Sequence, residues 1–331
     1  MNVVIGIKAL NEERHIAASI ESALAACARV GGTVVLADSG STDHTIAIAQ
    51  HYADVRILQL ADPAQRSCGT GAQLAFQAAS ARYFYLLDGD MVLDPAFLEA
   101  GIAFLEAHPR HAAVGGLVSE ANLGSIEFEL RARNDRLKGS AIAGDVDRLD
   151  CGGLYRVEAI RSVGYFADRN LHAFEEFELG ARLRAAGWNL ARIDVAAVVH
   201  HGHAVGGYRL MLRRLRSGYA GGPGEVVRAA WGRPHWRHVV RHFVQLRYSL
   251  AVIAWWAVLV VAALLGLWPA LLGVAILPLL FLVMRRGNFR LGLYSLVTWN
   301  MIAIGFLQGL ARRRVPPGGS IPAIDLSGPV A

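Results

Sequence analysis

A run of 37 residues without a charged side chain most constrains how this chain can fold. The run extends from Tyr248 to Met284, and arginines follow it directly. One helical crossing of a bilayer needs about 20 apolar residues, so the run is too long for one span and suits two short ones. We therefore predict membrane spans at about 248–267 and 269–284.

A third segment, 291–310, is less apolar because it contains Asn300 and Gln308, and arginines 312–314 follow it. If the N-terminal part is cytoplasmic, two spans return the arginines after Met284 to the cytoplasm, as the positive-inside rule requires. A third span would place 312–314 outside. We therefore expect 291–310 to be interfacial or re-entrant, with a spanning helix as the alternative. The end of the chain, 315–331, contains Pro and Gly and is expected to be disordered.

Apolar residues make up 54% of the chain, and the charges are unevenly distributed. Residues 1–205 contain 18 Lys or Arg and 25 Asp or Glu, a net charge of −7, whereas 206–331 contain 15 and 2, a net charge of +13. Residues 206–247 hold nine arginines and one acidic residue, which predicts basic amphipathic helices on an anionic membrane surface. A nucleic-acid partner is not expected, because these arginines flank apolar stretches and form no basic and aromatic groove pattern.

The first 205 residues alternate between strand-forming runs and helical patterns. The predicted strands cover 3–7, 33–37, 55–60, 83–87, 113–118 and 193–199. Short loops between alternating strands and helices are typical of a doubly wound, mostly parallel α/β sheet, which binds ligands at the carboxyl ends of its strands. Asn11 is expected to cap the first helix, with Glu12 and Glu13 in its first turn.

The cysteines and the N-terminus indicate where this α/β part resides. Cys27, Cys68 and Cys151 are widely spaced and odd in number, so they predict neither a disulfide framework nor a zinc site. The N-terminal apolar run is short and has no basic leader, so a signal peptide is not expected. Both features favour a reducing, cytoplasmic setting for residues 1–205.

Polar residues at the predicted strand ends are candidates for a ligand site. Asp88 and Asp90 follow a buried strand, and two carboxylates this close favour a hard divalent cation between them, although Asp-Gly is also ordinary turn chemistry. Asp38 follows the second strand, and Arg66 precedes a helix whose start could take a phosphate. Neither a Walker loop nor a G-x-G-x-x-G motif after a strand is present. A phosphorylated ligand with a metal ion fits these residues.

Two later segments add candidates. Glu175 and Glu176 begin a predicted helix, where the helix dipole favours ionised carboxylates, although acidic first turns are also ordinary helix design. His200 and His201 follow the last predicted strand and are candidate metal ligands, with a solvated turn as the alternative.

Four motifs in order resemble the family 2 glycosyltransferases of GT-A fold, over about residues 1–205. The motifs are Asn11-Glu12-Glu13, Asp38-Ser-Gly-Ser-Thr-Asp43, Asp88-Gly-Asp90 and Glu175-Glu176-x-x-Leu179-x-x-Arg182-Leu183-x-x-x-Gly187. The resemblance implies a GT-A (Rossmann-like) catalytic domain at 1–205, followed by the amphipathic and transmembrane helices. It also implies transfer of a sugar from a nucleoside diphosphate donor with inversion at the anomeric carbon.

The resemblance also implies roles for single residues. The donor would be bound by Asn11, Glu12, Asp38, Arg66 and Asp88, with Asp38 facing the base. Mg²⁺ or Mn²⁺ would be held by Asp88, Asp90, His200 and His201. Glu176 stands where the family usually places an aspartate as general base, so Glu175 and Glu176 are not distinguished. The Gln-x-x-Arg-Trp motif of processive synthases is absent, which favours a non-processive, hexosyltransferase type of enzyme.

The sequence thus predicts a metal-dependent glycosyltransferase, multi-pass in the cell inner membrane with its catalytic domain cytoplasmic. Its acceptor would be a lipid-linked saccharide, polyprenyl phosphate or membrane lipid in exopolysaccharide, lipopolysaccharide or glycolipid biosynthesis. Two alternatives remain: a nucleotidyltransferase of related fold, and a catalytically inactive membrane scaffold.

Overall fold

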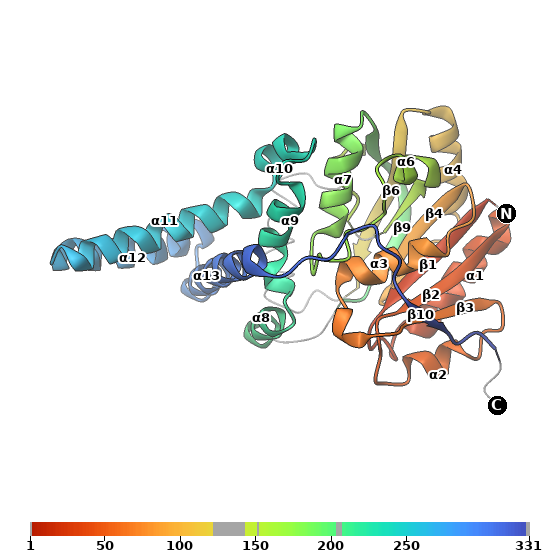
Figure 1. Ribbon diagram of the computed structural model, residues 1–331, viewed down its shortest axis with the longest axis horizontal. Coiled ribbons are helices and arrows are strands. Elements are labelled where there is room, and N and C mark those ends of the chain that lie inside the picture. The colour runs from red at the N-terminus through yellow and green to blue at the C-terminus, as the bar shows by residue number, and fades with distance from the viewer. Residues whose placement is uncertain (1, 122–142, 151, 203–206, 329–331) are drawn as a thin grey trace. The chain divides into compact units, whose positions relative to one another are not determined.

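The computed structural model describes residues 2–121, 143–150, 152–202 and 207–328 (Figure 1). The chain divides into two compact units. The N-terminal unit contains the described residues up to 202 and again those from Arg314 onward, and the C-terminal unit contains 207–313.

The N-terminal unit is built on one mixed sheet of ten strands. Its strands are β1 (Val3–Ala9), β2 (Gly32–Asp38), β3 (Val55–Leu60), β4 (Tyr83–Asp88), β5 (Met91–Leu93), β6 (His111–Glu120), β7 (Gly144–Asp145), β8 (Gly153–Arg156), β9 (Asn189–His200) and β10 (Ala323–Asp325). The order is β10-β3-β2-β1-β4-β8-β6-β9-β5, with β7 paired to β9. Strands β3, β2, β1 and β4 are mutually parallel, whereas β8 pairs antiparallel with both β4 and β6. The α/β class is confirmed, and the half of the sheet beyond β4 is mixed.

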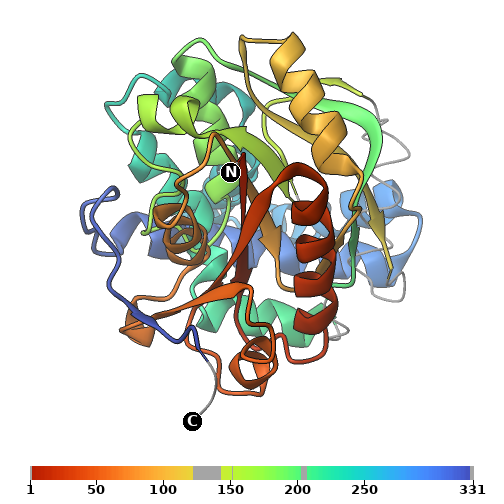
Figure 2. The same cartoon turned by 90° about the vertical axis from the view of Figure 1, so that its right-hand side faces the viewer.

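Helices cover both faces of this sheet (Figure 2). They are α1 (Ile16–Val30), α2 (Thr45–Ala49), α3 (Cys68–Gln77), α4 (Phe97–Ala107), α6 (Val157–Ser162) and α7 (Glu175–Ala185), with a 3-10 turn at Pro63–Gln65. Because side chains alternate along a strand, Ile5 of β1 packs with α1 and α4 on one face, and Val4 packs with α3, α6 and α7 on the other. The expected alternation of strands and helices therefore gives two apolar cores.

The predicted cap of the first helix is wrong. Helix α1 begins at Ile16, after His15, and its first turn contains no acidic residue. Asn11 instead has a φ of 58°, a left-handed conformation that asparagine adopts more readily than most residues. Its Oδ1 accepts a hydrogen bond from the backbone N–H of Thr42 at 2.8 Å, so the 11–13 segment is fastened to the loop after β2.

The expectation of a disordered C-terminal end is also wrong for the described part of it. Strand β10 pairs antiparallel with β3 and covers that edge of the sheet (Figure 1). Ile321 is only 2% exposed, and its backbone N–H and C=O both bond to the side-chain amide of Gln77. The tail therefore belongs to the N-terminal unit.

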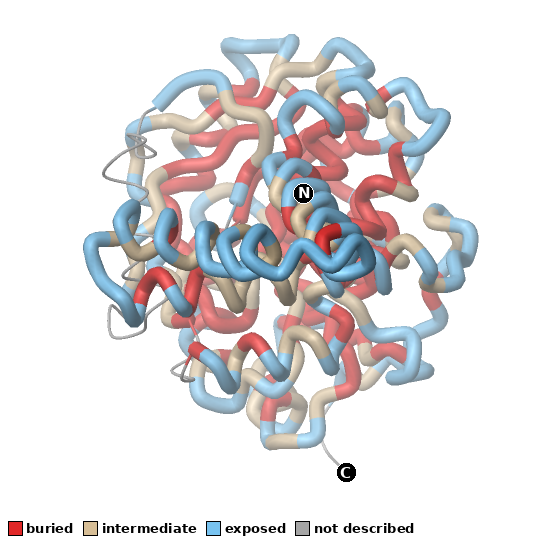
Figure 3. The backbone as a smooth tube through the Cα atoms, turned by 90° about the vertical axis from the view of Figure 1, so that its left-hand side faces the viewer, coloured by how far each residue is buried: buried red, intermediate tan, exposed pale blue. Residues whose placement is uncertain are grey.

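The C-terminal unit is helical. Its helices are α8 (Gly207–Arg216), α9 (Gly222–Ala230), α10 (Trp236–His242), α11 (Val244–Leu264), α12 (Trp268–Arg286) and α13 (Phe289–Ala311), with a 3-10 turn at Tyr219–Gly221. By length and composition, α11, α12 and α13 could each cross a membrane. The tube in Figure 3 is pale blue, and so exposed, along most of α11 and α12.

Helix α9 departs from the expected surface helix because it is mostly buried. It packs on α13 through glycines: a Cβ atom at Gly224, Gly305 or Gly309 would overlap backbone atoms of the facing segment. Glu225, which is 5% exposed, forms an ion pair with Arg312. The only acidic residue of 206–247 therefore holds the unit together rather than facing a membrane surface.

Candidate active site

Three parallel strands bring their carboxyl ends to one edge of the sheet. In the β1–β2 pair Ala9 lies opposite Asp38, and in the β1–β4 pair Lys8 lies opposite Asp88. Parallel register thus places the ends of β2 and β4 on either side of β1. This is the sheet edge at which α/β proteins bind ligands.

Lys8 is the central charge of this edge, and sequence analysis missed it. Its Nζ lies 3.2 Å from Oδ1 of Asp88 and 2.8 Å from Oε1 of Glu175. Burial by itself lowers the pKa of Lys8, but the Asp88 and Glu175 carboxylates hold that pKa well above its usual value. The one signal in the sequence is a lone cation inside an apolar strand.

Asp38 is fully buried, and its two oxygens accept hydrogen bonds from its own loop and from β3. Oδ1 accepts from the backbone N–H groups of Gly40 and Ser41, both at 2.9 Å, and from the side-chain amide of Gln59 at 3.0 Å. Oδ2 accepts from the Ser41 hydroxyl. Nearby, the Glu12 N–H donates to Oγ1 of Thr45 at 2.8 Å. In this structure Asp38 shapes the loop beside the site.

The start of α3 does not offer the phosphate-binding amides that the sequence suggested. The Gly69 N–H donates to the carbonyl of Leu171 at 2.9 Å, and the Thr70 N–H donates to Oγ of Ser67 at 2.9 Å. Arg66 itself is exposed, and its side chain makes no hydrogen bond or ion pair within the described residues. A role of Arg66 at the donor therefore stays a prediction.

Asp90 and His200 lie together because β5 pairs with the end of β9, with Met91 opposite His200. His200 Nε2 is 3.4 Å from Oδ2 of Asp90, and His200 Nδ1 is 2.8 Å from Oε2 of Glu120. Burial alone lowers the pKa of His200, but hydrogen bonds and the charges of Asp90 and Glu120 raise it to about 9. Glu120 is a second residue that sequence analysis missed.

The four predicted metal ligands are only partly assembled. Asp88 is turned toward Lys8, and its pKa is raised by burial although Lys8 opposes this. The ring of His201 stacks on His15, with ring centroids 4.9 Å apart, and the backbone N–H of His201 donates to the backbone carbonyl of Asp90 at 3.0 Å. No three His, Cys, Asp or Glu side chains in the described ranges are arranged to hold a metal ion by themselves.

The pair of Asp90 and His200 nevertheless fits a divalent cation. Carboxylate oxygen and imidazole nitrogen are ligands that Mn²⁺ accepts, and Mg²⁺ commonly uses one or two carboxylates and fills its other positions with water and phosphate oxygens. Glu120 accepts from the far nitrogen of His200, as the carboxylate partners of metal-binding histidines do.

Glu175 and Glu176 open α7, as predicted, but they lie in different surroundings. Glu175 is 6% exposed and paired with Lys8. Glu176 makes no hydrogen bond or ion pair within the described residues. Burial raises its pKa well above the usual value, Lys8 opposes this, and the carboxylates of Asp150 and Glu175 add to it. Phe174, just before the helix, has a φ of 66°, which is rare for an aromatic residue and marks a sharp entry into α7.

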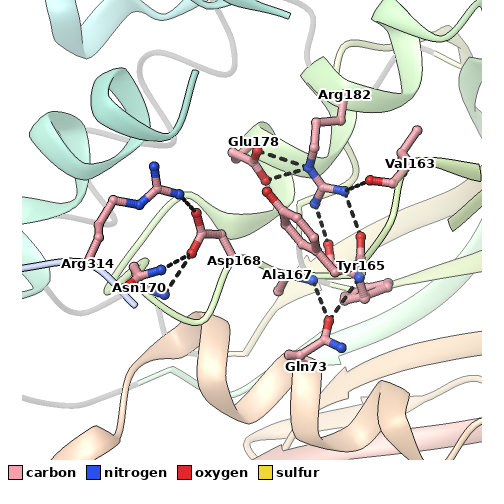
Figure 4. Close-up of polar contacts among 10 residues, drawn as sticks. Gln73, Val163, Tyr165, Ala167, Asp168, Asn170, Glu178, Arg182 and Arg314 are labelled. Atoms are coloured by element: carbon pink, nitrogen blue, oxygen red, sulfur yellow. Dashed lines mark hydrogen bonds and ion pairs between the residues drawn. The ribbon is translucent and has the colours of Figure 1, made fainter. Parts of the chain in front are cut away.

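A buried ion pair fixes α7 to the loop that precedes it (Figure 4). Nε of Arg182 donates to both oxygens of Glu178, four residues earlier in the helix, at 2.9 Å, and Glu178 is fully buried. The same guanidinium donates to the carbonyls of Val163, Tyr165 and Phe166 and stacks 4.0 Å from the Tyr165 ring centroid. Helix α7 therefore holds its two glutamates at a fixed place beside the sheet edge.

The C-terminal tail is fastened to this same loop (Figure 4). Arg314 forms an ion pair with Asp168, which is fully buried. Asn170 exchanges two hydrogen bonds with the backbone of Val315, both at 2.8 Å. The tail thus braces the segment between α6 and α7 in addition to closing the sheet.

Comparisons with known proteins agree with this architecture. Residues 4–162 match the family model described as Glycosyl transferase family 2. The succinoglycan biosynthesis protein ExoA of Rhizobium meliloti is 28% identical over 216 residues, which cover 61% of this chain and 63% of that protein. An N-acetylglucosaminyl-diphospho-decaprenol L-rhamnosyltransferase of Mycobacterium tuberculosis is 28% identical over 214 residues, which cover 53% of this chain and 68% of the relative. The match thus spans less than two thirds of the ExoA protein.

Among solved structures, the mannosyltransferase PcManGT from Pyrobaculum calidifontis, in complex with GDP-Man and Mn²⁺, has a TM-score of 0.63 at 17% identity. The match covers 92% of this chain and 87% of that structure. At this identity the likeness establishes the fold, which is that of GT-A transferases.

Proposed function

The N-terminal part of this chain, residues 4–162, belongs to glycosyltransferase family 2, and on that premise we propose that the protein is an inverting, non-processive hexosyltransferase. It moves a sugar from a nucleoside diphosphate donor to a lipid-linked acceptor during exopolysaccharide, lipopolysaccharide or glycolipid assembly. The observation that carries the proposal is the sheet edge at which Lys8 pairs with both Asp88 of β4 and Glu175 of α7, with Glu176 next to Glu175 in the helix. The names of the relatives, which include a polysaccharide biosynthesis protein and a decaprenyl diphosphate rhamnosyltransferase, support the class of acceptor.

Glu176 is the general base of this proposal. Glu175 is occupied by Lys8, whereas Glu176 is unpaired within the described residues and sits where burial raises its affinity for a proton. A base with a raised pKa takes a proton from an acceptor hydroxyl more readily than an ordinary carboxylate does. The hydroxyl oxygen bonds to the anomeric carbon as Glu176 takes its proton. The bond from that carbon to the diphosphate breaks, and the nucleoside diphosphate leaves with the electron pair.

In this proposal the donor binds at the part of the sheet edge that carries Asp90 and His200, and the acceptor hydroxyl approaches from Glu176. Asp90 and His200 would hold Mg²⁺ or Mn²⁺, and the ion would neutralise the negative charge that builds up on the leaving diphosphate. Lys8 holds Asp88 and Glu175 in place by its two ion pairs. Asp38, Asn11 and Glu12 shape the loop on which the nucleoside would rest, and the exposed Arg66 would contact the donor.

The membrane part is proposed to cross the bilayer twice, with the catalytic unit on the cytoplasmic face of the cell inner membrane. Strand β10 pairs with β3, so the chain returns after α13 to the side from which it left. An even number of crossings is then required, and three apolar helices cannot all span. In its most apolar window α13 is 39% buried in protein, against 6% for α12. We assign the crossings to α11 and α12.

The test is the release of nucleoside diphosphate by the detergent-solubilised protein, supplied with Mn²⁺ or Mg²⁺ and a membrane lipid extract. The donors are a panel of UDP-, GDP- and dTDP-sugars, and Asp90→Asn is the matched control. We expect release with one donor, lost on chelation and in the variant. Free pyrophosphate as product would show nucleotidyl transfer instead. A folded protein that binds no donor in calorimetry would support the inactive scaffold.

A further inference from the structure

Three arginines share one face of α8. With about 100° of rotation per residue, Arg209, Arg213 and Arg216 fall within an arc of roughly 60°. All three are exposed, and together with Leu212 and Ser217 they line a hollow on the surface of the C-terminal unit. The helix therefore presents a compact cationic face.

This face has no acidic partner in the described part of the chain. Arg209, Arg213 and Arg216 form no ion pair there, whereas other arginines of the unit are engaged. Arg228 donates to the carbonyls of Gly309 and Leu310, at 3.2 and 2.9 Å. Each unpaired guanidinium offers five N–H donors in a planar fork that matches two oxygens of a phosphate. The chemistry of the face is that of a phosphate site.

The opposite side of α8 packs on α13. Met211 is 7% exposed, and its sulfur lies 3.6 Å from the hydroxyl of Thr298. On the flank of α8, between Met211 and the arginines, the ring of Tyr208 meets the ring of Tyr294 edge-on, with centroids 5.3 Å apart. Both contacts fall in the first half of α13, which follows the two arginines at the end of α12. Positive residues at the end of an apolar helix lie at the level of lipid head groups, so α8 lies at that level as well.

Apolar side chains flank the arginines. Tyr208 and Leu212 are 47% and 45% exposed, on the side of α8 next to the cationic arc. A ligand that binds both the arginines and these apolar side chains carries a phosphate and a hydrocarbon chain. A helix that only rests on anionic lipid needs no more than charges spread along its polar face, whereas these three arginines all line one hollow.

We propose that Arg209, Arg213 and Arg216 bind the phosphate or diphosphate of the lipid-linked acceptor, with its hydrocarbon chain along Tyr208 and Leu212. The inference rests on the proposed function, because it assigns the site where the acceptor of that reaction is held. It also narrows the acceptor to a phosphorylated lipid, such as a polyprenyl phosphate or a saccharide carried on polyprenyl diphosphate.

The experiment compares two triple variants of the full-length protein. One is Arg209→Gln with Arg213→Gln and Arg216→Gln. The matched control is Arg233→Gln with Arg237→Gln and Arg241→Gln, which removes the same charge from exposed arginines of the same unit. Binding is measured without donor, to nanodiscs of neutral phospholipid containing either a polyprenyl phosphate or phosphatidylserine at equal charge. Thermal unfolding confirms that both variants are folded.

We expect the wild type to bind the polyprenyl phosphate discs more tightly, by about tenfold or more, because a specific site adds charge-assisted hydrogen bonds that attraction to the bulk charge of the membrane does not supply. The α8 variant should lose this preference and the control should keep it. In turnover, the acceptor KM should rise in the α8 variant while the donor KM stays unchanged.

Equal losses in both variants, or no preference in the wild type, would show that α8 responds only to the bulk charge of the membrane and would overturn the assignment. Because binding is measured without donor, selective binding in a protein that never releases a nucleoside diphosphate would refute the proposed function and leave this site standing. Turnover with an unchanged acceptor KM in the α8 variant would refute the site alone.

Discussion

Lys8 gives the two glutamates of α7 different surroundings. It forms ion pairs with both Asp88, at the end of β4, and Glu175, at the start of α7. Two carboxylates that would otherwise repel each other are held together beside Glu176. The residue-level difference between Glu175 and Glu176 is therefore electrostatic: Glu175 is paired with a lysine, whereas Glu176 has no such pair within the described residues and its pKa is raised by burial.

This difference predicts unequal effects of two matched substitutions. Glu176→Gln removes the proposed base and should lower kcat by about 10²- to 10⁴-fold, with little change in the donor KM. Glu175→Gln keeps Glu176 and weakens only the pairing with Lys8, so its kcat should fall less. Steady-state kinetics of nucleoside diphosphate release measures both. A larger kcat loss for Glu175→Gln would reverse the assignment.

His200 predicts a pH dependence of stability in the metal-free protein. Its folded-state pKa of about 9 lies above the ordinary value of 6.5, so the protonated imidazole stabilises the fold through Asp90 and Glu120. This contribution is complete below the ordinary pKa and is lost as the pH rises through about 9. In EDTA, the Tm of the wild type should therefore exceed that of His200→Gln at about pH 6, and the gap should shrink by about pH 9.5. A constant gap would show that His200 does not change its charge in this range.

At the scale of elements, the C-terminal tail is an integral part of the catalytic unit. Ile321 is buried in the core beside Gln77, whereas Ile324, three positions later, is 50% exposed. Ile321→Ala should cost about 2–4 kcal/mol of unfolding free energy, since it deletes buried methylenes and leaves a cavity. Ile324→Ala, the matched control, should cost less than about 1 kcal/mol. Thermal unfolding of the solubilised protein compares them, and equal effects would mean that the tail is not packed.

Sequence patterns predicted the elements whose signal is local. The observed bounds of β3 equal the predicted ones, and β4 begins at the predicted Tyr83 and extends one residue further, to Asp88, because 55–60 and 83–87 are runs bounded by turn residues. The short strand β10 was missed because three residues in a Pro- and Gly-containing tail carry no periodicity of their own. The strand forms because it pairs with the otherwise open edge of β3.

The site residues that the sequence predicted are those with a local signal, as for the strands. Asp88, Asp90, Glu175, Glu176 and His200 stand at ends of local elements, and their placement at one edge follows from strand order. Lys8 and Glu120 were missed because their partners are remote: Lys8 and Glu175 are 167 positions apart, and Glu120 and His200 are 80 apart. Local periodicity contains no information on such pairs.

At the scale of the whole molecule, the return of the tail to β3 predicts a topology that labelling can measure. The background has Cys27, Cys68 and Cys151 replaced by alanine, and Leu265→Cys or Val315→Cys is added singly. Leu265, in the turn between α11 and α12, is 67% exposed, and Val315 is 52% exposed. With two crossings, an impermeant maleimide should label Leu265→Cys from the periplasmic side of intact cells and should reach Val315→Cys only after the membrane is opened. Labelling of both from outside would indicate three crossings.

The pairing of β10 with β3 also sets the order in which the molecule can be completed. The backbone N–H of Ile57 donates to Oγ of Ser327, 270 positions later in the chain, at 2.9 Å. During synthesis the N-terminal sheet therefore forms with one edge open, and the apolar helices emerge and meet the membrane before the closing strand exists. A chain whose helices fail to insert keeps that edge unpaired, and unpaired edges are where chaperones and proteases find unfinished proteins. The catalytic unit is therefore completed by β10 only after the apolar helices have been synthesised and have met the membrane.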